Sequence, residues 1–193
     1  MIHVYGYLRV TQSYELTYDG NDDRAHFHGY TDADYAGDIM TRRSTSGFVY
    51  MLCKGAISWS SQRQRTVATS STESEYIASN HAGKEGVWLR SLLQSLQPFT
   101  SPSNPHRTLQ ATTLLADNQS AINITENPEN HQRTKHFDVK WHWIREQVER
   151  QVFAIKYIPT DEMTADIMTK ALARAKHERH RAAMGLTGSD VAP

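Results

Sequence analysis

The stretch "GFVYMLCKGAISWSSQ", Gly47–Gln62, has the pattern of a β-hairpin and decides the class of the fold. Phe48–Cys53 and Ala56–Ser60 carry the β-branched and aromatic residues that are typical of strands. Between them, Lys54 and Gly55 predict a two-residue turn in which glycine supplies the positive φ. We therefore expect two antiparallel strands joined by a tight turn.

The pattern continues on both sides of the hairpin. "HFHGYTDA", residues 26–33, predicts a preceding strand and completes a three-stranded antiparallel meander. "YELTYD", residues 14–19, alternates apolar and polar residues and predicts a further strand. From Thr72 onward the apolar residues follow helical spacing, which predicts a long helix that ends near Gln97, before a loop rich in proline and serine.

The rest of the chain alternates between the two periods. It predicts a strand at "TLLAD" (113–117), helices at "NQSAINITEN" (118–127) and "HFDVKWHWIREQVERQV" (136–152), a strand at "FAIKYIP" (153–159) and a helix at "DEMTADIMTKAL" (161–172). A meander followed by alternating helices and strands favours a mixed α/β fold with helices on both faces of one sheet.

Composition limits the function classes. The 193 residues suit one domain, or one domain with a tail. Lys+Arg and Asp+Glu both number 21, so a surface for polyanions must be a local patch. The single cysteine, Cys53, excludes an internal disulfide framework and favours a reducing compartment. No apolar run approaches the roughly 20 residues that span a bilayer, so we expect a soluble, intracellular protein.

Four carboxylates occupy informative positions: Asp32 and Asp117 end strands, whereas Glu75 and Asp166 lie in the first turns of helices. Ligands of open α/β sheets collect at such places. Clustered carboxylates repel one another unless cations join them, and Mg²⁺ prefers oxygen ligands. Two such ions about 3.5–4 Å apart support phosphodiester hydrolysis. Asp34 shares a strand face with Asp32, so alternation alone leaves both open as ligands.

Each of these carboxylates also has a simpler explanation. Thr72 and Glu75 fit a capping box at the start of the long helix. Asp117 could cap the helix that follows it. Asp166 would be favoured by the helix dipole. No single residue is specific, and the signal is the order of all four along strands and helices.

Block after block, the chain resembles one known family. The blocks are "GYTDADYAGD", "RRSTSGFVYML", "ISWSSQRQRTVATSSTESEYIA", "LLADNQSAINI", "RTKHFDVKWHWIREQV" and "YIPTDEMTADIMTKAL". Together they resemble the ribonuclease H domain of copia-type retrotransposon polyproteins, from about Tyr5 to Leu186. The resemblance implies a ribonuclease H-like fold with a five-stranded mixed sheet. It also implies a reverse transcriptase domain that cuts the RNA strand of RNA–DNA hybrids.

The resemblance implies roles for individual residues. The metal ligands and catalytic residues would be Asp32, Glu75, Asp117 and Asp166, holding two Mg²⁺ ions, with Mn²⁺ as a substitute. Many cellular ribonucleases H carry a histidine before the last aspartate, and the span "IPTDEMTA" lacks one. His136, which belongs to the copia-type pattern, could act near the site or could make a structural hydrogen bond at a helix start. Hybrid contacts are expected at Thr69, Ser70, Ser71, Thr72 and Gln119. Basic loop residues could meet phosphates: Arg42, Arg43, Arg63, Arg65, Arg133 and Lys135.

The expected setting follows from the same family. Residues 1–22 would be the tail of an upstream reverse transcriptase connection, 23–175 the ribonuclease H domain, and 176–193 a partly disordered tail. The polymerase domain of the same polyprotein and the hybrid would be the partners, in cytoplasmic virus-like particles or in the nucleus. Two alternatives stay open: an integrase or transposase core, and a catalytically silent or domesticated nucleic-acid-binding module.

Overall fold

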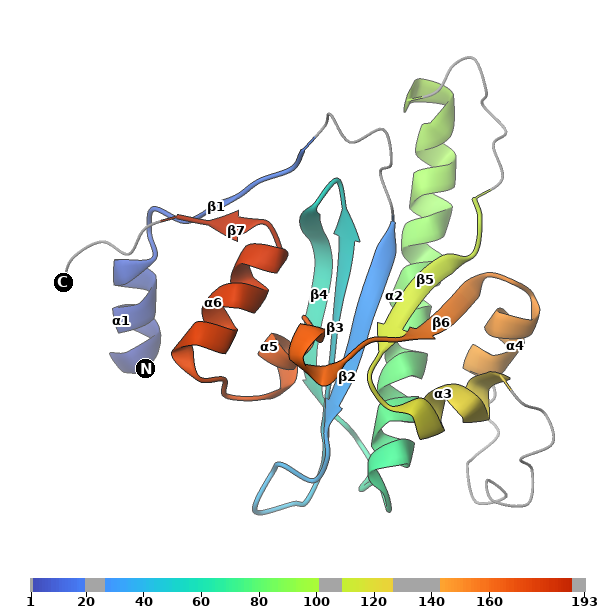
Figure 1. The fold of residues 1–193 in the computed structure, drawn as a ribbon, viewed down its shortest axis with the longest axis horizontal. Coiled ribbons are helices and arrows are strands. Elements are labelled where there is room, and N and C mark those ends of the chain that lie inside the picture. Colours follow the sequence, from blue (N-terminus) through green and yellow to red (C-terminus); the bar gives the residue numbers. More distant parts are fainter. Residues whose placement is uncertain (1, 20–26, 101–108, 127–142, 189–193) are drawn as a thin grey trace.

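A five-stranded mixed sheet forms the centre of the computed structural model, which describes residues 2–19, 27–100, 109–126 and 143–188 (Figure 1). The strands lie in the order β4-β3-β2-β5-β6. β2, β3 and β4 are antiparallel, whereas β5 and β6 run parallel to β2. Their bounds are His28–Asp34 (β2), Thr45–Leu52 (β3), Gly55–Arg63 (β4), Thr112–Ala116 (β5) and Phe153–Tyr157 (β6). The expected fold class and ribonuclease H-like topology are confirmed.

Helices cover both faces of the sheet. On one face lie α2 (Ser71–Thr100), α3 (Gln119–Glu126) and α4 (Trp143–Glu149). The other face holds the short α5 (Asp166–Thr169), with α6 (Arg174–Ala183) beside it (Figure 1). Residues 136–142 of the predicted helix 136–152 lie outside the described residues, and residues 143–149 of it form α4. Among the described residues, no helix is both long and apolar enough to cross a membrane.

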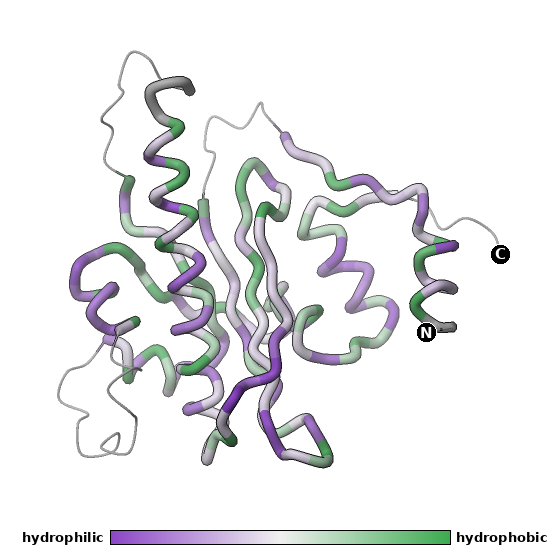
Figure 2. Tube along the Cα trace, turned by 180° about the vertical axis from the view of Figure 1, so that it is seen from behind, coloured by the Kyte–Doolittle hydropathy of each residue, from purple (hydrophilic) through white to green (hydrophobic). Residues whose placement is uncertain are grey.

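Two apolar clusters hold these layers together, one on each face. Phe48 and Tyr50 of β3 join the cluster under α2, and the Tyr50 hydroxyl donates to the Ala82 carbonyl at 2.8 Å. Val49 and Met51 of the same strand join the cluster on the opposite face. Successive side chains of a strand point to opposite faces, so β3 is apolar on both faces over residues 48–52. Figure 2 shows hydrophobic colours along this hairpin and hydrophilic colours along much of α6.

The hairpin turn differs from the prediction by one residue. Cys53 and Lys54, with φ of 51° and 63°, are the two turn residues, and Gly55 pairs with Leu52 as the first residue of β4. Two positive φ values are typical of a type I′ turn. Gly55 is needed for packing: a Cβ there would lie 2.5 Å from the Tyr18 ring. The close approach of Tyr18, a residue distant in sequence, therefore explains why position 55 is a glycine; the turn does not.

The C-terminal prediction also needs correction. "DEMTADIMTKAL" does not form one helix. It contains a 3-10 turn, η3 (Thr160–Glu162), and then α5, which ends at an extended Lys170. Unforeseen, α6 and β7 (Leu186–Thr187) follow, in the segment expected to be a tail. β7 pairs with β1 (Glu15–Leu16), the part of "YELTYD" that forms a strand. The domain limits stay a prediction.

The long helix differs from expectation in a smaller way. α2 begins at Ser71 and continues past the expected end at Gln97 to Thr100. At the other end of the chain, α1 (Ile2–Val10) is a helix that leads into β1. The pairing of β1 with β7 places α1 and α6 on the same side of the molecule (Figure 1).

Candidate metal centre

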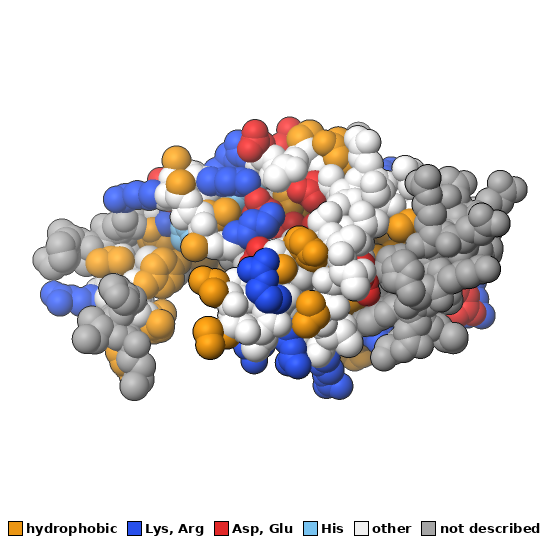
Figure 3. Space-filling view, turned by 90° about the horizontal axis from the view of Figure 1, so that it is seen from below, with side chains coloured by type: hydrophobic (Ala, Val, Ile, Leu, Met, Phe, Trp, Pro, Cys, Tyr) orange, Lys and Arg blue, Asp and Glu red, His pale blue; other side chains and the backbone are white. Residues whose placement is uncertain are grey.

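Three carboxylates meet at one end of the sheet. Asp32 lies near the end of β2, Asp117 directly follows β5, and Glu75 is in the first turns of α2. One oxygen of each lies within 4.8 Å of the others. β2 and β5 are parallel neighbours, so their carboxyl ends share an edge. Figure 3 shows acidic side chains near the middle of this end of the molecule, flanked by lysines and arginines.

Asp32 is 1% exposed and pairs in register with Gly47 of β3. A Cβ on Gly47 would lie 2.8 Å from the Met168 Cβ, so the missing side chain lets α5 cross the sheet closely at this point. α5 thereby brings Thr169 to Asp32, and the Thr169 hydroxyl donates to the Asp32 Oδ2. Close packing of α5 on β3 thus places Asp32 next to the final acidic segment.

Glu75 is free of the capping role that the sequence suggested. The Ser70 Oγ accepts the Glu73 N–H at 3.1 Å, and the Glu73 carboxylate accepts the Thr69 N–H at 2.6 Å. The expected cap of Thr72 with Glu75 is therefore wrong, because Ser70 and Glu73 cap α2 two residues earlier. Glu75 instead faces the other carboxylates, and its Oε2 is buried without a hydrogen-bond partner among the residues that the structure describes.

Asp117 is likewise not the cap of the next helix. The Asn118 Oδ1 accepts the Ala121 N–H at 2.9 Å and so caps α3. The Asp117 Oδ2 accepts a hydrogen bond from the Thr160 hydroxyl at 2.8 Å. This bond connects Asp117 to η3, the turn that leads toward Asp166.

Asp166, the first residue of α5, is buried and held by two lysines. Lys170 Nζ lies 2.9 Å from the Asp166 Oδ1 and 3.3 Å from the Asp32 Oδ1. Lys176 Nζ, from α6, lies 2.6 Å from the Asp166 Oδ2 and donates to the Thr160 carbonyl at 3.4 Å. Lys170 thus joins Asp166 to the group of three.

The pKa values of these carboxylates are shifted in different directions. Burial raises the pKa of Glu75 well above its ordinary value, and the charges of Asp32 and Asp117 raise it further. Burial also raises the pKa of Asp32, although Lys170 opposes the shift. Burial would raise the pKa of Asp166 too, but the bonds from Lys176 and Lys170 outweigh it and lower this pKa. The positive charge that compensates a buried carboxylate is therefore greatest at Asp166 and weakest at Glu75.

The group of Asp32, Glu75 and Asp117 fits a hard divalent cation. Three carboxylate oxygens are the ligand type that Mg²⁺ and Mn²⁺ accept. A buried oxygen without a partner is uncommon in native proteins, and the Glu75 Oε2 is one. A cation there would satisfy this oxygen and neutralise the like charges around it.

Lys176→Met is expected to lower the free energy of unfolding by about 1–3 kcal/mol in the absence of divalent cations. The Asp166 side chain is only 1% exposed and would lose its shortest ion pair, while Lys170 remains. Thermal or urea unfolding in EDTA measures the change.

The matched control is Lys54→Met. Lys54 Nζ lies 2.8 Å from the Asp19 Oδ2, but this pair is exposed, with side-chain exposures of 64% and 39%. Exposed pairs contribute about 0–1 kcal/mol. Equal losses in the two variants would contradict the view that Lys176 stabilises a buried carboxylate.

Some of the residues expected to contact nucleic acid lie at helix starts or in a loop of the described structure, and others lie outside the described residues. Thr69, Ser70 and Ser71 are exposed at the start of α2, Thr72 is half-buried there, and Gln119 is exposed at the start of α3. The hydroxyls of Thr69 and Ser70 also serve the cap. Arg42 and Arg43 lie in the loop between β2 and β3. Arg133, Lys135 and the catalytic candidate His136 lie outside the described residues.

The other two aspartates of "YTDADYAGD" are separated from the centre. Asp34 is not part of the group of three; its carboxylate lies against Gly37, where a Cβ would come within 1.7 Å of the Asp34 Oδ2. Asp38 accepts the Thr41 N–H at 2.9 Å and pairs with Arg63 at 2.6 Å. These bonds hold the pKa of Asp38 well below its usual range. Asp38 thus stabilises the loop before β3.

Sequence reasoning missed the groups that surround the carboxylates, namely Thr160, Thr169, Lys170 and Lys176. The spacing of Asp166 and Lys170 by four residues is the one local signal that could have indicated an ion pair. Lys176 belongs to a helix that the sequence had not predicted, so no local pattern could have placed it at Asp166.

Curated relatives match most of this chain. It is 42% identical over 180 residues to the retrovirus-related Pol polyprotein from transposon TNT 1-94 of Nicotiana tabacum, covering 93% of this chain and 13% of the relative. The corresponding polyprotein from transposon RE1 of Arabidopsis thaliana is 34% identical, covering 83% and 10%. The secreted RxLR effector protein 161 of Plasmopara viticola is 52% identical over 83 residues, covering 43% and 58%.

Solved structures with a similar arrangement are more distant. The RNase H1 of the halophilic archaeon Halobacterium salinarum matches with a TM-score of 0.41 and 16% identity, covering 74% of this chain and 93% of that one. LC11-RNase H1, isolated from compost by a metagenomic approach, matches with a TM-score of 0.45 and 18% identity, covering 75% and 93%. No family model matches the chain.

The two transposon relatives match nearly the full length of this chain, although it spans only 13% and 10% of theirs. The blocks that carry the carboxylates lie in a fold whose strand order agrees with the topology expected of ribonuclease H. The chain therefore belongs, as one segment, to the family of retrovirus-related Pol polyproteins of copia-type transposons.

Proposed function

We propose that this chain hydrolyses the RNA strand of RNA–DNA hybrids with the help of bound Mg²⁺, for which Mn²⁺ can substitute. One observation carries the proposal: oxygens of Asp32, Glu75 and Asp117 lie within 4.8 Å of one another, and within the described part of the chain the buried Glu75 Oε2 has no partner. A hydrolytic site of this family is supported by the Pol polyprotein relatives. The hybrid is the substrate that reverse transcription itself produces.

The residues of the site would divide the work. Asp32, Glu75 and Asp117 would hold one ion, and Asp166 together with Asp32 would hold a second. When bound, Mg²⁺ supplies charge neutralisation and an acidified water for phosphodiester hydrolysis. Thr160 and Thr169 orient Asp117 and Asp32 through their hydroxyls. Lys170 and Lys176 keep Asp166 ionised. The Lys170 ammonium, which lies 2.9 Å and 3.3 Å from the Asp166 and Asp32 carboxylates, would give way to a second ion held by these two residues.

The start of α2 would meet the hybrid. A hybrid presents phosphates and 2′-hydroxyls across a wide, shallow minor groove. Ser71 is exposed there and directly follows Ser70, whose hydroxyl accepts the Glu73 N–H and caps α2. Gln119, also exposed, starts the helix directly after Asp117. Small polar side chains on both sides of the carboxylates can therefore contact the strand that is cut.

In its parent polyprotein the chain would act beside a polymerase domain, in cytoplasmic particles or in the nucleus. The relatives are much longer Pol polyproteins, of which this chain corresponds to about a tenth. A polymerase domain in the same polyprotein would supply the hybrid directly, so the longer protein is the second form in which activity should be measured.

The test is a cleavage assay with an end-labelled RNA–DNA hybrid. The chain is expected to cut the RNA strand in Mg²⁺ or Mn²⁺, to stop cutting in EDTA, and to leave a DNA duplex of the same sequence intact. Calorimetry should detect binding of Mn²⁺ to the same preparation.

Two results would contradict the proposal. If neither the chain nor the longer protein cut the hybrid, although both bound it, the chain would be a catalytically silent nucleic-acid-binding module. If the DNA duplex were cut as readily as the hybrid, the integrase or transposase alternative would be favoured.

A further inference from the structure

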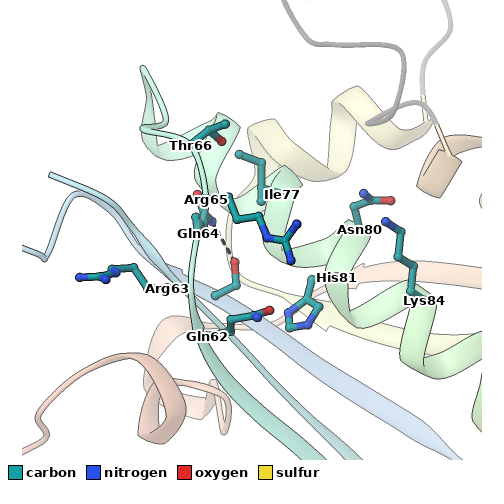
Figure 4. Close-up of a pocket in the computed structure, with 10 residues that line it drawn as sticks. Gln62, Arg63, Gln64, Arg65, Thr66, Ile77, Asn80, His81 and Lys84 are labelled. Atoms are coloured by element: carbon teal, nitrogen blue, oxygen red, sulfur yellow. Dashed lines mark hydrogen bonds between the residues drawn. The ribbon is translucent and has the colours of Figure 1, made fainter. Parts of the chain in front are cut away.

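A basic groove lies between the end of β4 and α2, beside the candidate metal centre. It encloses about 390 Å³ and is lined on one side by residues 62–66 and on the other by Ile77, Asn80, His81 and Lys84 of α2. Figure 4 shows Arg65 reaching from the end of β4 toward α2, where Asn80, His81 and Lys84 lie. Side chains from two elements therefore converge on one space.

Two cations of this groove are available to a ligand. Arg65 and Lys84 are exposed, and neither forms an ion pair or hydrogen bond within the described part of the chain. Arg63 differs, because it is paired with Asp38 at 2.6 Å. Burial lowers the pKa of the half-buried His81, which disfavours a charge on this ring. The positive charge of the groove therefore comes mainly from Arg65 and Lys84.

Two buried amides line the same groove. Gln64 and Asn80 are 5% and 2% exposed, and the structure gives neither side-chain oxygen a hydrogen-bond partner among the described residues. The Gln64 amide nitrogen donates to the Ser46 hydroxyl at 2.9 Å and to the Ser74 carbonyl at 3.0 Å. Buried amides that lack a partner are uncommon and indicate a place where a polar ligand or water can bind.

The contacts of Gln64 also place the groove next to the carboxylates. Ser74 is the residue before Glu75, and Ser46 is the residue before Gly47, which pairs with Asp32. Neighbouring strands lie about 4.8 Å apart, so β4 and the groove are two strand spacings from β2. Nucleic-acid strands advance by about 3.4 Å per nucleotide, and a strand across the metal centre reaches the groove within a few nucleotides.

We infer that this groove binds a backbone phosphate of the hybrid, a few nucleotides from the bond that is cut. The inference rests on the proposed function. Arg65 and Lys84 would approach the phosphate from opposite walls. The amides of Gln64 and Asn80 offer hydrogen bonds to the adjoining sugar hydroxyl. The groove thereby holds the hybrid in register while the carboxylates act.

The experiment compares Arg65→Gln, Lys84→Gln and the double variant with wild type. Fluorescence anisotropy with a labelled hybrid in EDTA, which keeps the strand intact, gives the dissociation constant at several salt concentrations. We expect the double variant to bind roughly 10- to 100-fold more weakly. Each lost phosphate contact should reduce the slope of log K against log[salt] by about 1. In cleavage assays KM should rise while kcat at saturating hybrid stays within twofold.

Lys156→Gln is the matched control, because Lys156 is exposed on β6 at the opposite edge of the sheet and its loss also removes one positive charge. Both groove positions are exposed, so all variants should melt within a few degrees of wild type. Groove variants that bind like Lys156→Gln, with the same salt slope, would overturn the inference.

The remaining outcomes separate the inference from the proposed function. If wild type cuts the hybrid and the groove variants behave normally, the groove assignment falls and the function stands. If wild type neither binds nor cuts the hybrid, the proposed function itself falls. Tight binding of inorganic phosphate or a mononucleotide that Arg65→Gln abolishes, with normal hybrid binding, would assign the groove to a small phosphate ligand and overturn the strand contact.

Discussion

Asp32→Asn is expected to reduce hybrid cleavage by roughly a thousandfold or more, whereas Asp34→Asn should keep nearly full activity. A metal centre contributes several kcal/mol to hydrolysis, and each 1.4 kcal/mol or so is a tenfold change in rate. Asp32 is buried among Glu75 and Asp117, whereas Asp34 is half-buried against Gly37. Cleavage of a labelled hybrid in Mg²⁺ measures both variants.

This pair is matched, because the two aspartates lie two positions apart on the same face of β2. Asn keeps the shape and the hydrogen bond from Thr169 but removes the charge at position 32. Calorimetry should show weakened Mn²⁺ binding for Asp32→Asn alone. The opposite pattern, with activity lost only in Asp34→Asn, would make Asp34 the ligand; equal activity of both variants would contradict the metal centre.

Glu75→Gln is expected to stabilise the metal-free protein while it abolishes metal binding and cleavage. Glu75 is buried, its Oε2 has no partner, and the charges of Asp32 and Asp117 oppose its ionisation. Relief of a buried unsatisfied polar group is worth about 1–3 kcal/mol, and the Gln amide can donate to the neighbouring carboxylates. Denaturant unfolding in EDTA and Mn²⁺ calorimetry give the two readouts.

Glu73→Gln is the control on the same helix. Glu73 belongs to the cap of α2, where its carboxylate accepts from Thr69. Loss of its charge at the helix start should lower stability by about 0.3–1 kcal/mol and leave metal binding intact. If Glu75→Gln also destabilised the metal-free protein, repulsion among the carboxylates would not be the dominant cost at this site.

The pH dependence of stability gives an independent check on Glu75. Its pKa is raised in the folded state, so the folded protein binds more protons than the unfolded chain above pH 4.5. Stability from this group is present at low pH and is lost as pH rises through the folded pKa. Asp32 acts in the same sense. The lowered pKa values of His81 and His180 act in the opposite sense near pH 6.5.

The difference between wild type and Glu75→Gln isolates the carboxylate from these histidines. In EDTA, the advantage of Glu75→Gln should grow as pH is raised from 5 to 8. Saturating Mn²⁺ should reverse it, because the ion stabilises the ionised cluster of wild type. A difference that is independent of pH would show that Glu75 does not change its protonation in this range.

Much of the fold could be predicted because its signals are local. Alternation along β3 and helical spacing after Thr72 are properties of neighbouring residues, and they correctly predicted the meander and the long helix. The prediction of Lys54 and Gly55 as the turn was wrong. Glycine is required at position 55 because the Tyr18 ring, from a distant segment, leaves no space for a Cβ there. The helix predicted at 161–172 was wrong because the exposed turn η3 ends before α5 begins, and α5 packs against β2, β3 and β4.

The candidate carboxylates could be named from the sequence, but their competing roles could not be resolved there. In the sequence, Glu75 fitted a capping box with Thr72, and Asp117 fitted a cap of the helix that follows it. The structure assigns capping to Glu73 with Ser70, and to Asn118. Only the placement of α2 and β5 on one sheet shows that Glu75 and Asp117 turn toward the same point.

By itself, the sequence determined the order of strands and helices from β2 to β6 and the positions of the four candidate carboxylates, because hydrophobic period and residue type are encoded over a few neighbouring residues. Tertiary structure decided which acid of each local pair meets the others, and it brought Lys170 and Lys176 to Asp166. The reason is physical: burial, charge repulsion and compensation depend on distances between elements, and those distances exist only once the sheet, α2, α5 and α6 have packed together.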